Sequence, residues 1–347
     1  MARWRLRTKA IFVYLGSLAL ILGFLSVFTI NGNLFSDPKT EIINRRKMLM
    51  QKVAVDRIDV NGLYVNEPFK KELPVIGAQF IGKYKEEVKN ELDVSKYNKD
   101  GVWEIPPLSI LPNISWADLS TIYHGYLENV QIECKNPERV GKITDGGWQI
   151  CEDPQHKPPP GSLVYSFGIN NDFSFDDAMA KKYKTQVHSF DPSMNIKDHD
   201  RSDLVKFHAT GISDYTGPSD KGWNMATLTD IKNQLGHTKE TVSVLKMDIE
   251  EWEWKVLPQL IKSNSLNNIK QLLIEVHACE GCAIFRADRN NEASKERYIQ
   301  GLQTYQHLYD LGFRLFWIHK NSACRYRSKF TDKEISACHE IHFLHVD

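Results

Sequence analysis

The sequence lacks a net charge, because its 44 lysine and arginine residues balance its 44 aspartate and glutamate residues. No field of one sign over the whole chain therefore favours nucleic acid or an acidic partner, and we expect no nucleic-acid partner. Internal repeats and long low-complexity tracts are also absent. The partners of this protein must be predicted from local features of the chain.

Charge is missing altogether over residues 10–30, "AIFVYLGSLALILGFLSVFTI", which follow four basic residues. At about 1.5 Å per residue this run is long enough to cross a bilayer as a helix. A cleaved signal peptide is the alternative, but "SVFTI" lacks its small-residue cleavage site. The positive-inside rule puts residues 1–9 in the cytosol, which predicts a single-pass type II membrane protein of the endoplasmic reticulum, Golgi or cell surface. In its lumenal part, Asn113 of "NIS" is an N-glycosylation acceptor.

Cysteine is scarce, with six residues and a single CxxC motif, "CEGC" at 279–282. In an oxidising compartment an even number of cysteines favours disulfides. We expect Cys134 to pair with Cys151 and the four C-terminal cysteines to pair among themselves. A zinc site of "CEGC" with Cys338 and His339 is the alternative. Since zinc ribbons need a second CxxC, we expect no metal site.

The distribution of apolar residues predicts five segments. After the tail (1–9) and the membrane anchor (10–30), a lysine- and glutamate-rich lumenal stem covers residues 31–110. Residues 111–160 form an N-terminal extension of the catalytic domain with a helix within 115–130. From 161 to 347, short apolar runs alternate with helical patterns near 174–184, 227–235, 249–263 and 294–311. This alternation predicts an α/β domain, a Rossmann-like doubly wound parallel sheet with crossover helices.

Ligands of such sheets bind beyond the carboxyl ends of the strands, so the loops there are candidate sites. In "SFGINND", Gly168 lets the backbone turn near a ligand, and Asn170 tolerates turn conformations. Asp191 ends the next strand, 23 residues beyond Gly168, where an acid accepts hydrogen bonds from a ribose. The spacing suits an adenosine-containing ligand but does not separate S-adenosylmethionine from NAD. A turn-forming aspartate before Pro192 is the alternative.

The stretch "VLKMDIEEWEWKVL", residues 244–257, runs from an apolar strand into a cluster of acids. Asp248 lies at the strand tip. On a helix turning about 100° per residue, Glu250 and Glu253 fall on the apolar side, whereas Glu251 and Lys255 form a solvated pair. Buried carboxylates need partners or a cleft, so Asp248, Glu250 and Glu253 are site candidates. Interaction with the helix dipole is the alternative for Glu250.

At the end of "LLIEVH", Glu275 and His277 share one face of a predicted strand. Histidine titrates nearest to neutral pH, so His277 is a candidate general base or metal ligand. A hydrogen-bonded structural histidine is the alternative.

Three of these segments resemble known methyltransferases. "VLKMDIEEWEWKVL" resembles the "lKiDvEGaEleVL" segment of FkbM-type S-adenosylmethionine-dependent methyltransferases, and "SFGINND" stands at their "DvGANiG"-like loop. "RVGKITDGGWQIC" followed by "SLVYSFGINNDFSFDDAMA" resembles the methyltransferase-like 24 group. The resemblance covers about residues 115–347 and implies the class I methyltransferase fold. Asp248, Glu250 and Glu253 match the acids of the family's fourth-strand motif.

Carried over by position, the resemblance gives Gly168 and Asn170 to the methionine end of S-adenosylmethionine and Asp191 to its ribose. Two residues depart from the family pattern: Ser166 replaces an acid and Asp172 replaces a glycine. An anionic Asp172 argues against the pyrophosphate of NAD and suits a cationic sulfonium, so it joins the predicted cofactor contacts.

The sequence thus predicts a membrane-anchored lumenal methyltransferase that methylates an oxygen of a glycan or small polar acceptor. Asp248 or His277 would remove the acceptor proton, with Glu250 beside them. One alternative is a Golgi-type glycosyltransferase in which Asp248 and Glu250 clamp a metal on a nucleotide sugar. A second alternative, favoured by Ser166 and Asp172, is a non-catalytic binding module with a degenerate methyltransferase fold.

Overall fold

The computed structural model describes residues 92–143, 146–278 and 292–346. The predicted tail, the membrane anchor and residues 31–91 of the predicted stem lie outside these ranges, as does the "CEGC" motif. Within these ranges no helix combines the length and the apolar character that crossing a bilayer requires.

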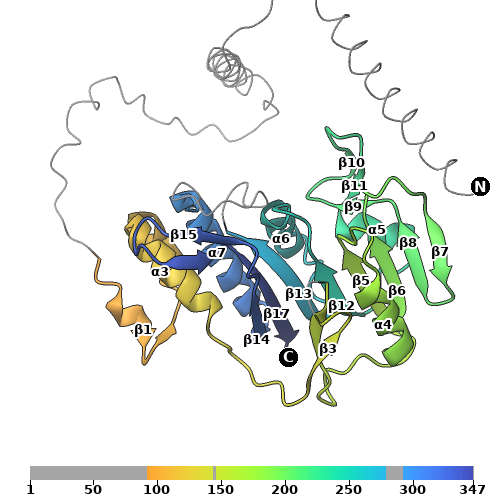
Figure 1. Cartoon of the computed structure of the whole chain (residues 1–347), viewed down its shortest axis with the longest axis horizontal. Helices are drawn as coiled ribbons and strands as arrows, with labels where there is room; N and C mark the ends of the chain where they lie inside the picture. Colours follow the sequence, from red (N-terminus) through yellow and green to blue (C-terminus); the bar gives the residue numbers. More distant parts are fainter. Residues whose placement is uncertain (1–91, 144–145, 279–291, 347) are drawn as a thin grey trace, which may run out of the picture. The chain divides into compact units, whose positions relative to one another are not determined.

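Within the described residues, eight strands form the main sheet in the order β14-β17-β13-β12-β5-β6-β8-β7 (Figure 1). The strands β5, β6, β8, β12 and β13 run parallel, whereas β17 is antiparallel to both of its neighbours and β7 to β8. This mixed α/β sheet is consistent with a methyltransferase fold. The bounds of its strands are Leu163–Phe167 (β5), Gln186–Phe190 (β6), His199–Ser202 (β7), Val205–His208 (β8), Val242–Met247 (β12), Ile269–His277 (β13), Phe313–Lys320 (β14) and Cys338–His345 (β17).

The central strands are buried on both faces, which explains their mostly apolar sequences. In β5 every residue is buried. Leu163, Tyr165 and Phe167 face one hydrophobic core, and Val164 faces the other. Helices α3, α5, α6 and α7 contribute to the first core, and α4 with the β3–β4 hairpin (Pro137–Val140 and Trp148–Cys151) contributes to the second. The helices span Trp116–Leu127 (α3), Ser174–Tyr183 (α4), Leu228–Gln234 (α5), Glu253–Lys262 (α6) and Lys295–Asp310 (α7).

The helix predicted for residues 249–263 begins only at Glu253. Glu250 and Glu251 instead have left-handed backbones, with φ of 52° and 71°. The predicted burial of Glu250 and Glu253 assumed a regular helix of 100° per residue, and this turn interrupts that regular helix. Glu253 is fully buried as predicted, but the Glu250 side chain is 69% exposed, so its predicted burial is wrong. Glu251 likewise precedes the first residue of the helix.

Residues 94–110, at the end of the predicted stem, pack onto the domain. Two short strands, β1 (Asn98–Lys99) and β2 (Val102–Trp103), precede the 3₁₀ helix η3 (Leu108–Asn113). Trp103, Ile105 and Leu108 contact the first hydrophobic core. A Cβ on Gly125 of α3 would lie 2.2 Å from the Trp103 ring, so only glycine lets the two segments approach.

A separate three-stranded sheet follows β8 along the chain. It consists of β9 (Gly211–Ile212), β10 (Gly217–Pro218) and β11 (Asn224–Ala226), in the order β10-β11-β9. The apolar run "LVKFHATGI" is divided between β8 and β9. A further hairpin, β15 (Arg325–Arg327) and β16 (Glu334–Ser336), lies between β14 and β17 in the sequence.

Candidate functional site

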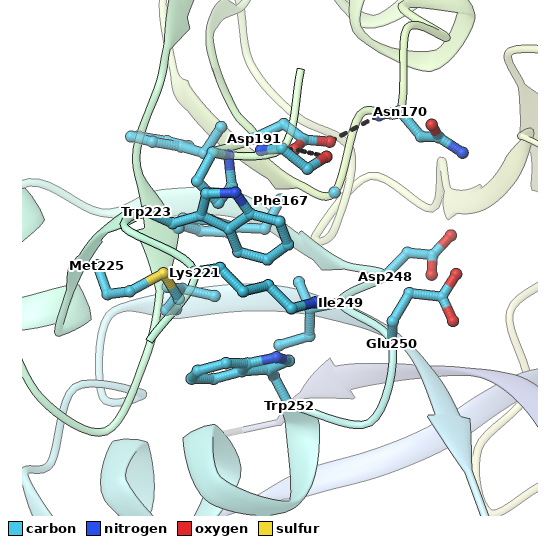
Figure 2. Close-up of a pocket in the computed structure, with 16 residues that line it drawn as sticks. Phe167, Asn170, Asp191, Lys221, Trp223, Met225, Asp248, Ile249, Glu250 and Trp252 are labelled. Atoms are coloured by element: carbon cyan, nitrogen blue, oxygen red, sulfur yellow. Dashed lines mark hydrogen bonds between the residues drawn. The ribbon is translucent and has the colours of Figure 1, made fainter. Parts of the chain in front are cut away.

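A cavity of about 340 Å³ lies at the carboxyl ends of β5, β6 and β12 (Figure 2). From β5 the chain adds β6 and β8 on one side of the sheet, and it then returns to add β12 and β13 on the other. Ligands of doubly wound sheets bind in the crevice at such a reversal. Five of the eight predicted site residues line this cavity: Gly168, Asn170, Asp191, Asp248 and Glu250.

The loop after β5 lies directly against the end of β12. Gly168 has φ of 76°, and a Cβ there would lie only 1.6 Å from the carbonyl oxygen of Asp248. Asn170 and Asn171 also have left-handed backbones, with φ of 44° and 64°. Glycine and asparagine are the residues that adopt this conformation most readily. The predicted turn is confirmed, and it brings the glycine loop to the strand tip that carries Asp248.

Asp191 holds this loop in place through its carboxylate. Its Oδ2 accepts the backbone N–H groups of Ile169 (3.0 Å) and Asn170 (2.8 Å). Its Oδ1 accepts the backbone N–H (2.8 Å) and the hydroxyl (2.6 Å) of Ser193. These four hydrogen bonds occupy the acceptor sites of the carboxylate. Asp191 therefore acts as the turn-forming aspartate that the sequence offered as the alternative to a ribose ligand.

Asp172, a predicted cofactor contact, is not among the residues that line the cavity. Its Oδ1 accepts the backbone N–H of Ser174 at the start of α4 (3.0 Å), and its Oδ2 lies 2.8 Å from the Lys142 ammonium. The predicted cofactor contact is therefore corrected, because Asp172 stabilises the first turn of a helix and is neutralised by lysine.

Lys246, which the sequence pattern did not single out, fixes the glycine loop from within the sheet. This buried side chain donates hydrogen bonds to the carbonyl groups of Phe167 (3.1 Å) and Gly168 (2.9 Å). Burial raises the pKa of the nearby Asp176 carboxyl, although Ser189 and Lys246 oppose this shift.

Aromatic rings form the remaining wall of the cavity. Phe167 and Phe190 stack with ring centroids 4.5 Å apart. Figure 2 shows the Lys221 side chain extending between the indoles of Trp223 and Trp252, and its ammonium lies 4.4 Å from the Trp223 ring centroid. Sequence reasoning missed Lys221 and Trp223 because they belong to a hairpin outside the main sheet. Their only sequence signal is "KGWN", where a tryptophan follows a turn glycine.

His277 is the last residue of β13 and is buried. Its ring Nδ1 lies 2.9 Å from Oε1 of Glu253, which also accepts the backbone N–H of His277 at 2.7 Å. Its other ring nitrogen, Nε2, lies 3.5 Å from Oε2 of Glu250. His277 is therefore held by two carboxylates and is not among the residues that line the cavity.

The neighbouring acids set the protonation of this histidine. Burial opposes a charged ring, but the hydrogen bond and charge of Glu253, together with Glu275 and Glu250, raise the pKa of His277 to about 10. Burial and the charge of Asp248 raise the pKa of Glu275 to about 8. At neutral pH His277 thus carries a proton already, which does not suit the predicted role of general base. Desolvation raises the pKa of Glu250, an effect that His277 opposes and Asp248 reinforces.

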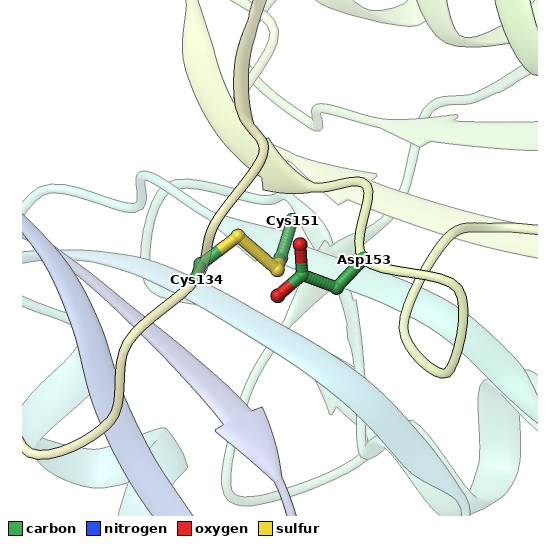
Figure 3. A group of neighbouring side chains, drawn as sticks. All are labelled: Cys134, Cys151 and Asp153. Atoms are coloured by element: carbon green, nitrogen blue, oxygen red, sulfur yellow. A yellow bond between two sulfur atoms is a disulfide. The ribbon is translucent and has the colours of Figure 1, made fainter.

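One group of possible metal ligands lies away from the cavity and is already engaged (Figure 3). It consists of Cys134, Cys151 and Asp153, but the two sulfur atoms form a disulfide, which confirms the predicted pairing. The Asp153 carboxylate accepts the backbone N–H groups of Lys135 and Asn136, each at 3.0 Å. Because metals bind the thiolate form of cysteine, this cluster stabilises a loop and holds no metal.

Two of the four C-terminal cysteines lie within the described residues. Cys324 pairs with Cys338, as the prediction that these cysteines pair among themselves requires. Cys338 therefore offers no thiolate to a zinc ion. The alternative zinc site, which needed Cys338 beside the "CEGC" motif, is not supported.

Comparisons with known proteins give the same assignment as the fold. Residues 106–309 match the model of a family described as "Methyltransferase domain". A rat protein named "Probable methyltransferase-like protein 24" is 30% identical over 182 residues, which are 48% of this chain and 49% of the relative. The human protein of the same name is 29% identical over 168 residues, covering 44% of this chain and 45% of the relative. The chain thus spans about half the length of these curated relatives.

Proposed function

Since the chain belongs to this family of methyltransferase domains, we propose that it transfers the methyl group of S-adenosylmethionine to an oxygen of a glycan or small polar acceptor. The matched residues include the whole lining of the cavity. The observation that carries the proposal is the position of this cavity at the strand-order reversal. There the glycine loop meets the acidic tip of β12.

The lining of the cavity suits a cationic cofactor. Its volume of about 340 Å³ falls within the range of small-molecule sites. The indole face of Trp223 already has an ammonium over it, and aromatic faces attract a sulfonium in the same way. The carboxylates of Asp191, Asp248 and Glu250 line the cavity against the single cation Lys221. Such a lining favours a sulfonium and an amino group over the pyrophosphate of NAD.

The acids at the end of β12 supply the proton acceptor. When bound, S-adenosylmethionine supplies an electrophilic methyl group, which the acceptor oxygen attacks while the carbon–sulfur bond breaks toward sulfur. The hydroxyl proton of the acceptor then passes to a carboxylate, for which Asp248 and Glu250 are placed at the cavity. Glu250 suits this task because its side chain is exposed at the cavity, where an acceptor can reach it, and because desolvation raises its pKa.

We also propose that the domain lies in the lumen, anchored by residues 10–30. Two disulfides among the described residues fit an oxidising compartment. Asn113 of the predicted glycosylation site is exposed at the end of η3, where it is accessible to modification.

Titration calorimetry of the purified protein with S-adenosylmethionine tests the proposed function. We expect binding in the micromolar range, and at least about tenfold weaker binding by Asp191→Asn, because an amide nitrogen would face the N–H donors of the loop. The matched control is Asp200→Asn, an exposed aspartate on β7 that should bind like the unmodified protein.

Two results would contradict the proposal. One is no binding of S-adenosylmethionine at high micromolar concentration, and the other is equal binding by Asp191→Asn and the unmodified protein. Manganese-dependent binding of a nucleoside diphosphate sugar, tested in parallel, would favour the glycosyltransferase alternative.

A further inference from the structure

A second cavity, of about 360 Å³, lies at the same edge of the main sheet as the cavity described above. Its walls come from α3, the end of β14, the start of β17 and the β15–β16 hairpin. Because β17 is antiparallel to β13, its first residues lie beside the carboxyl end of β13. The residues that line this second cavity are all different from those that line the first.

Two buried histidines in this lining have a ring nitrogen without a partner. His124 is 8% exposed and His339 is 1% exposed, and their ring centroids lie 5.9 Å apart. Among the described residues, the Nδ1 atom of each has no hydrogen-bond partner. A buried polar atom without a partner destabilises the fold, and a ligand that supplies the partner removes this cost.

The hydroxyl groups beside His124 determine which of its ring nitrogens carries the proton. Tyr298 and Tyr326 each donate their only hydroxyl proton to Oε1 of Glu292. Nε2 of His124 lies 3.0 Å from the Tyr326 oxygen, so Nε2 is the donor of this hydrogen bond. Among the described residues neither ring nitrogen contacts a carboxylate, and a buried charge without a partner is costly, so the ring is neutral. Nδ1 of His124 therefore offers a lone pair to a hydrogen-bond donor.

The charged side chains of the lining disfavour a cationic donor. The lining has three basic residues against two acids, and the acids are already paired. Lys320 pairs with Glu128, and Arg325 lies 3.5 Å from Glu334. The third basic residue, Lys333, has no ion pair within the part of the chain that the structure describes. A ligand ammonium would meet this excess of positive charge, whereas a carboxylate would find a free partner.

We propose that the second cavity binds an acidic sugar residue of a glycan. Its carboxylate pairs with Lys333, and its hydroxyl groups bind Nδ1 of His124 and Nδ1 of His339. A hydroxyl group both donates and accepts, so it satisfies the lone pair on His124 and either protonation state of His339 Nδ1. A hexuronate carries several hydroxyl groups and one carboxylate on a single ring, which is the combination that this lining requires.

The second cavity is linked to the first through β13. Asn321, in the wall of the second cavity, donates a hydrogen bond to Glu275 at 3.0 Å. Nε2 of His277, two residues further along β13, lies 3.5 Å from Oε2 of Glu250, which lines the first cavity. A glycan held in the second cavity can thus extend along the sheet edge toward the reacting groups. This consequence rests on the proposed methyl transfer, whereas the binding of the sugar does not.

Calorimetric titration of the full-length protein tests the site. The acidic probe is a tetrasaccharide of alternating glucuronate and N-acetylglucosamine, and the neutral probe is a tetramer of N-acetylglucosamine. We expect the acidic probe to bind with a Kd below about 1 mM and the neutral probe at least about fivefold more weakly. Lys333→Gln should weaken binding of the acidic probe at least about fivefold. The matched control is Lys206→Gln, which removes an exposed lysine of β8 and should leave the affinity unchanged.

His339→Phe separates a binding role from a structural one. Phenylalanine keeps an aromatic ring but removes the unpaired buried nitrogen, so the variant should melt at the same temperature as the unmodified protein or higher. The same variant should bind the acidic probe at least about tenfold more weakly, because the hydrogen bond from the sugar is lost.

Three outcomes would overturn the proposal. The first is no binding of the acidic probe at about 5 mM, and the second is equal affinity for the acidic and the neutral probe. The third is unchanged affinity for the acidic probe in Lys333→Gln or in a folded His339→Phe variant. Since S-adenosylmethionine is absent from these titrations, a failure of the proposed function would not affect their result.

Discussion

Replacing Glu253 by glutamine tests the buried ion pair beneath the site. Glu253 is fully buried and accepts two hydrogen bonds from His277. Glutamine keeps the volume of the side chain but removes its charge. Removing one partner of a buried pair destabilises a protein by about 3–5 kcal/mol. Raising the pKa of His277 from its ordinary 6.5 to about 10 corresponds to about 5 kcal/mol, in the same range.

The raised pKa of His277 also sets the direction of the pH dependence. This contribution is fully present below the unfolded pKa of 6.5 and is lost as the pH rises through about 10. Between these limits the folded chain binds one more proton than the unfolded chain, so its stability falls by about 1.4 kcal/mol per pH unit. Glu253→Gln removes most of this slope. The difference in free energy of unfolding between the two proteins should therefore shrink by about 3 kcal/mol from pH 7 to pH 9.

Guanidinium unfolding measured at pH 7, 8 and 9 provides the assay, with tryptophan fluorescence as the probe. Glu296→Gln is the control, since it removes an exposed acid from the first turn of another helix and should change stability by less than about 1 kcal/mol. A destabilisation by Glu253→Gln that stays constant from pH 7 to pH 9 would refute the charged pair.

Three further predictions concern the loop, a disulfide and the compartment. Gly168→Ala should cost at least about 1–2 kcal/mol and abolish cofactor binding, because its Cβ would strike the Asp248 carbonyl group; thermal melts and calorimetry measure both effects. Replacing Cys134 and Cys151 by serine should lower the free energy of unfolding by about 3 kcal/mol, measured by denaturant unfolding, since the bond closes a loop with a sequence separation of 17. In secretory cells, Asn113→Gln should abolish a glycosidase-sensitive gel shift; a chain that never shows this shift would contradict the lumenal assignment.

The sequence predicted the central strands and the helices because their patterns are local. β5 and β12 consist mostly of apolar residues and are buried throughout, as strands covered on both faces require. The position of β17 between β13 and β14 was not predicted. Which strands become neighbours depends on the path of the whole chain, and an antiparallel insertion leaves no mark in the periodicity of any one strand.

The residues of the site also divide into those that a local pattern predicts and those that depend on distant parts of the chain. Gly168 and Asn170 were found because a left-handed turn selects these residue types. Glu250 and Glu251 adopt left-handed backbones too, but glutamate does not favour that conformation. The sequence pattern therefore predicted a helix from residue 249, whereas the helix begins at Glu253. Lys246 was missed for another reason. Its role depends on carbonyl groups of a neighbouring strand, which no pattern within its own strand reveals.

The insertion of β17 has a consequence for how the chain is made. β14 leaves the ribosome before β17, yet both edges that β17 joins, on β13 and on β14, remain unpaired until residues 338–345 have been synthesised. Unpaired strand edges are templates for association with other chains. The nascent domain therefore passes through a stage with two open edges, and premature termination before residue 338 would leave a product prone to aggregation.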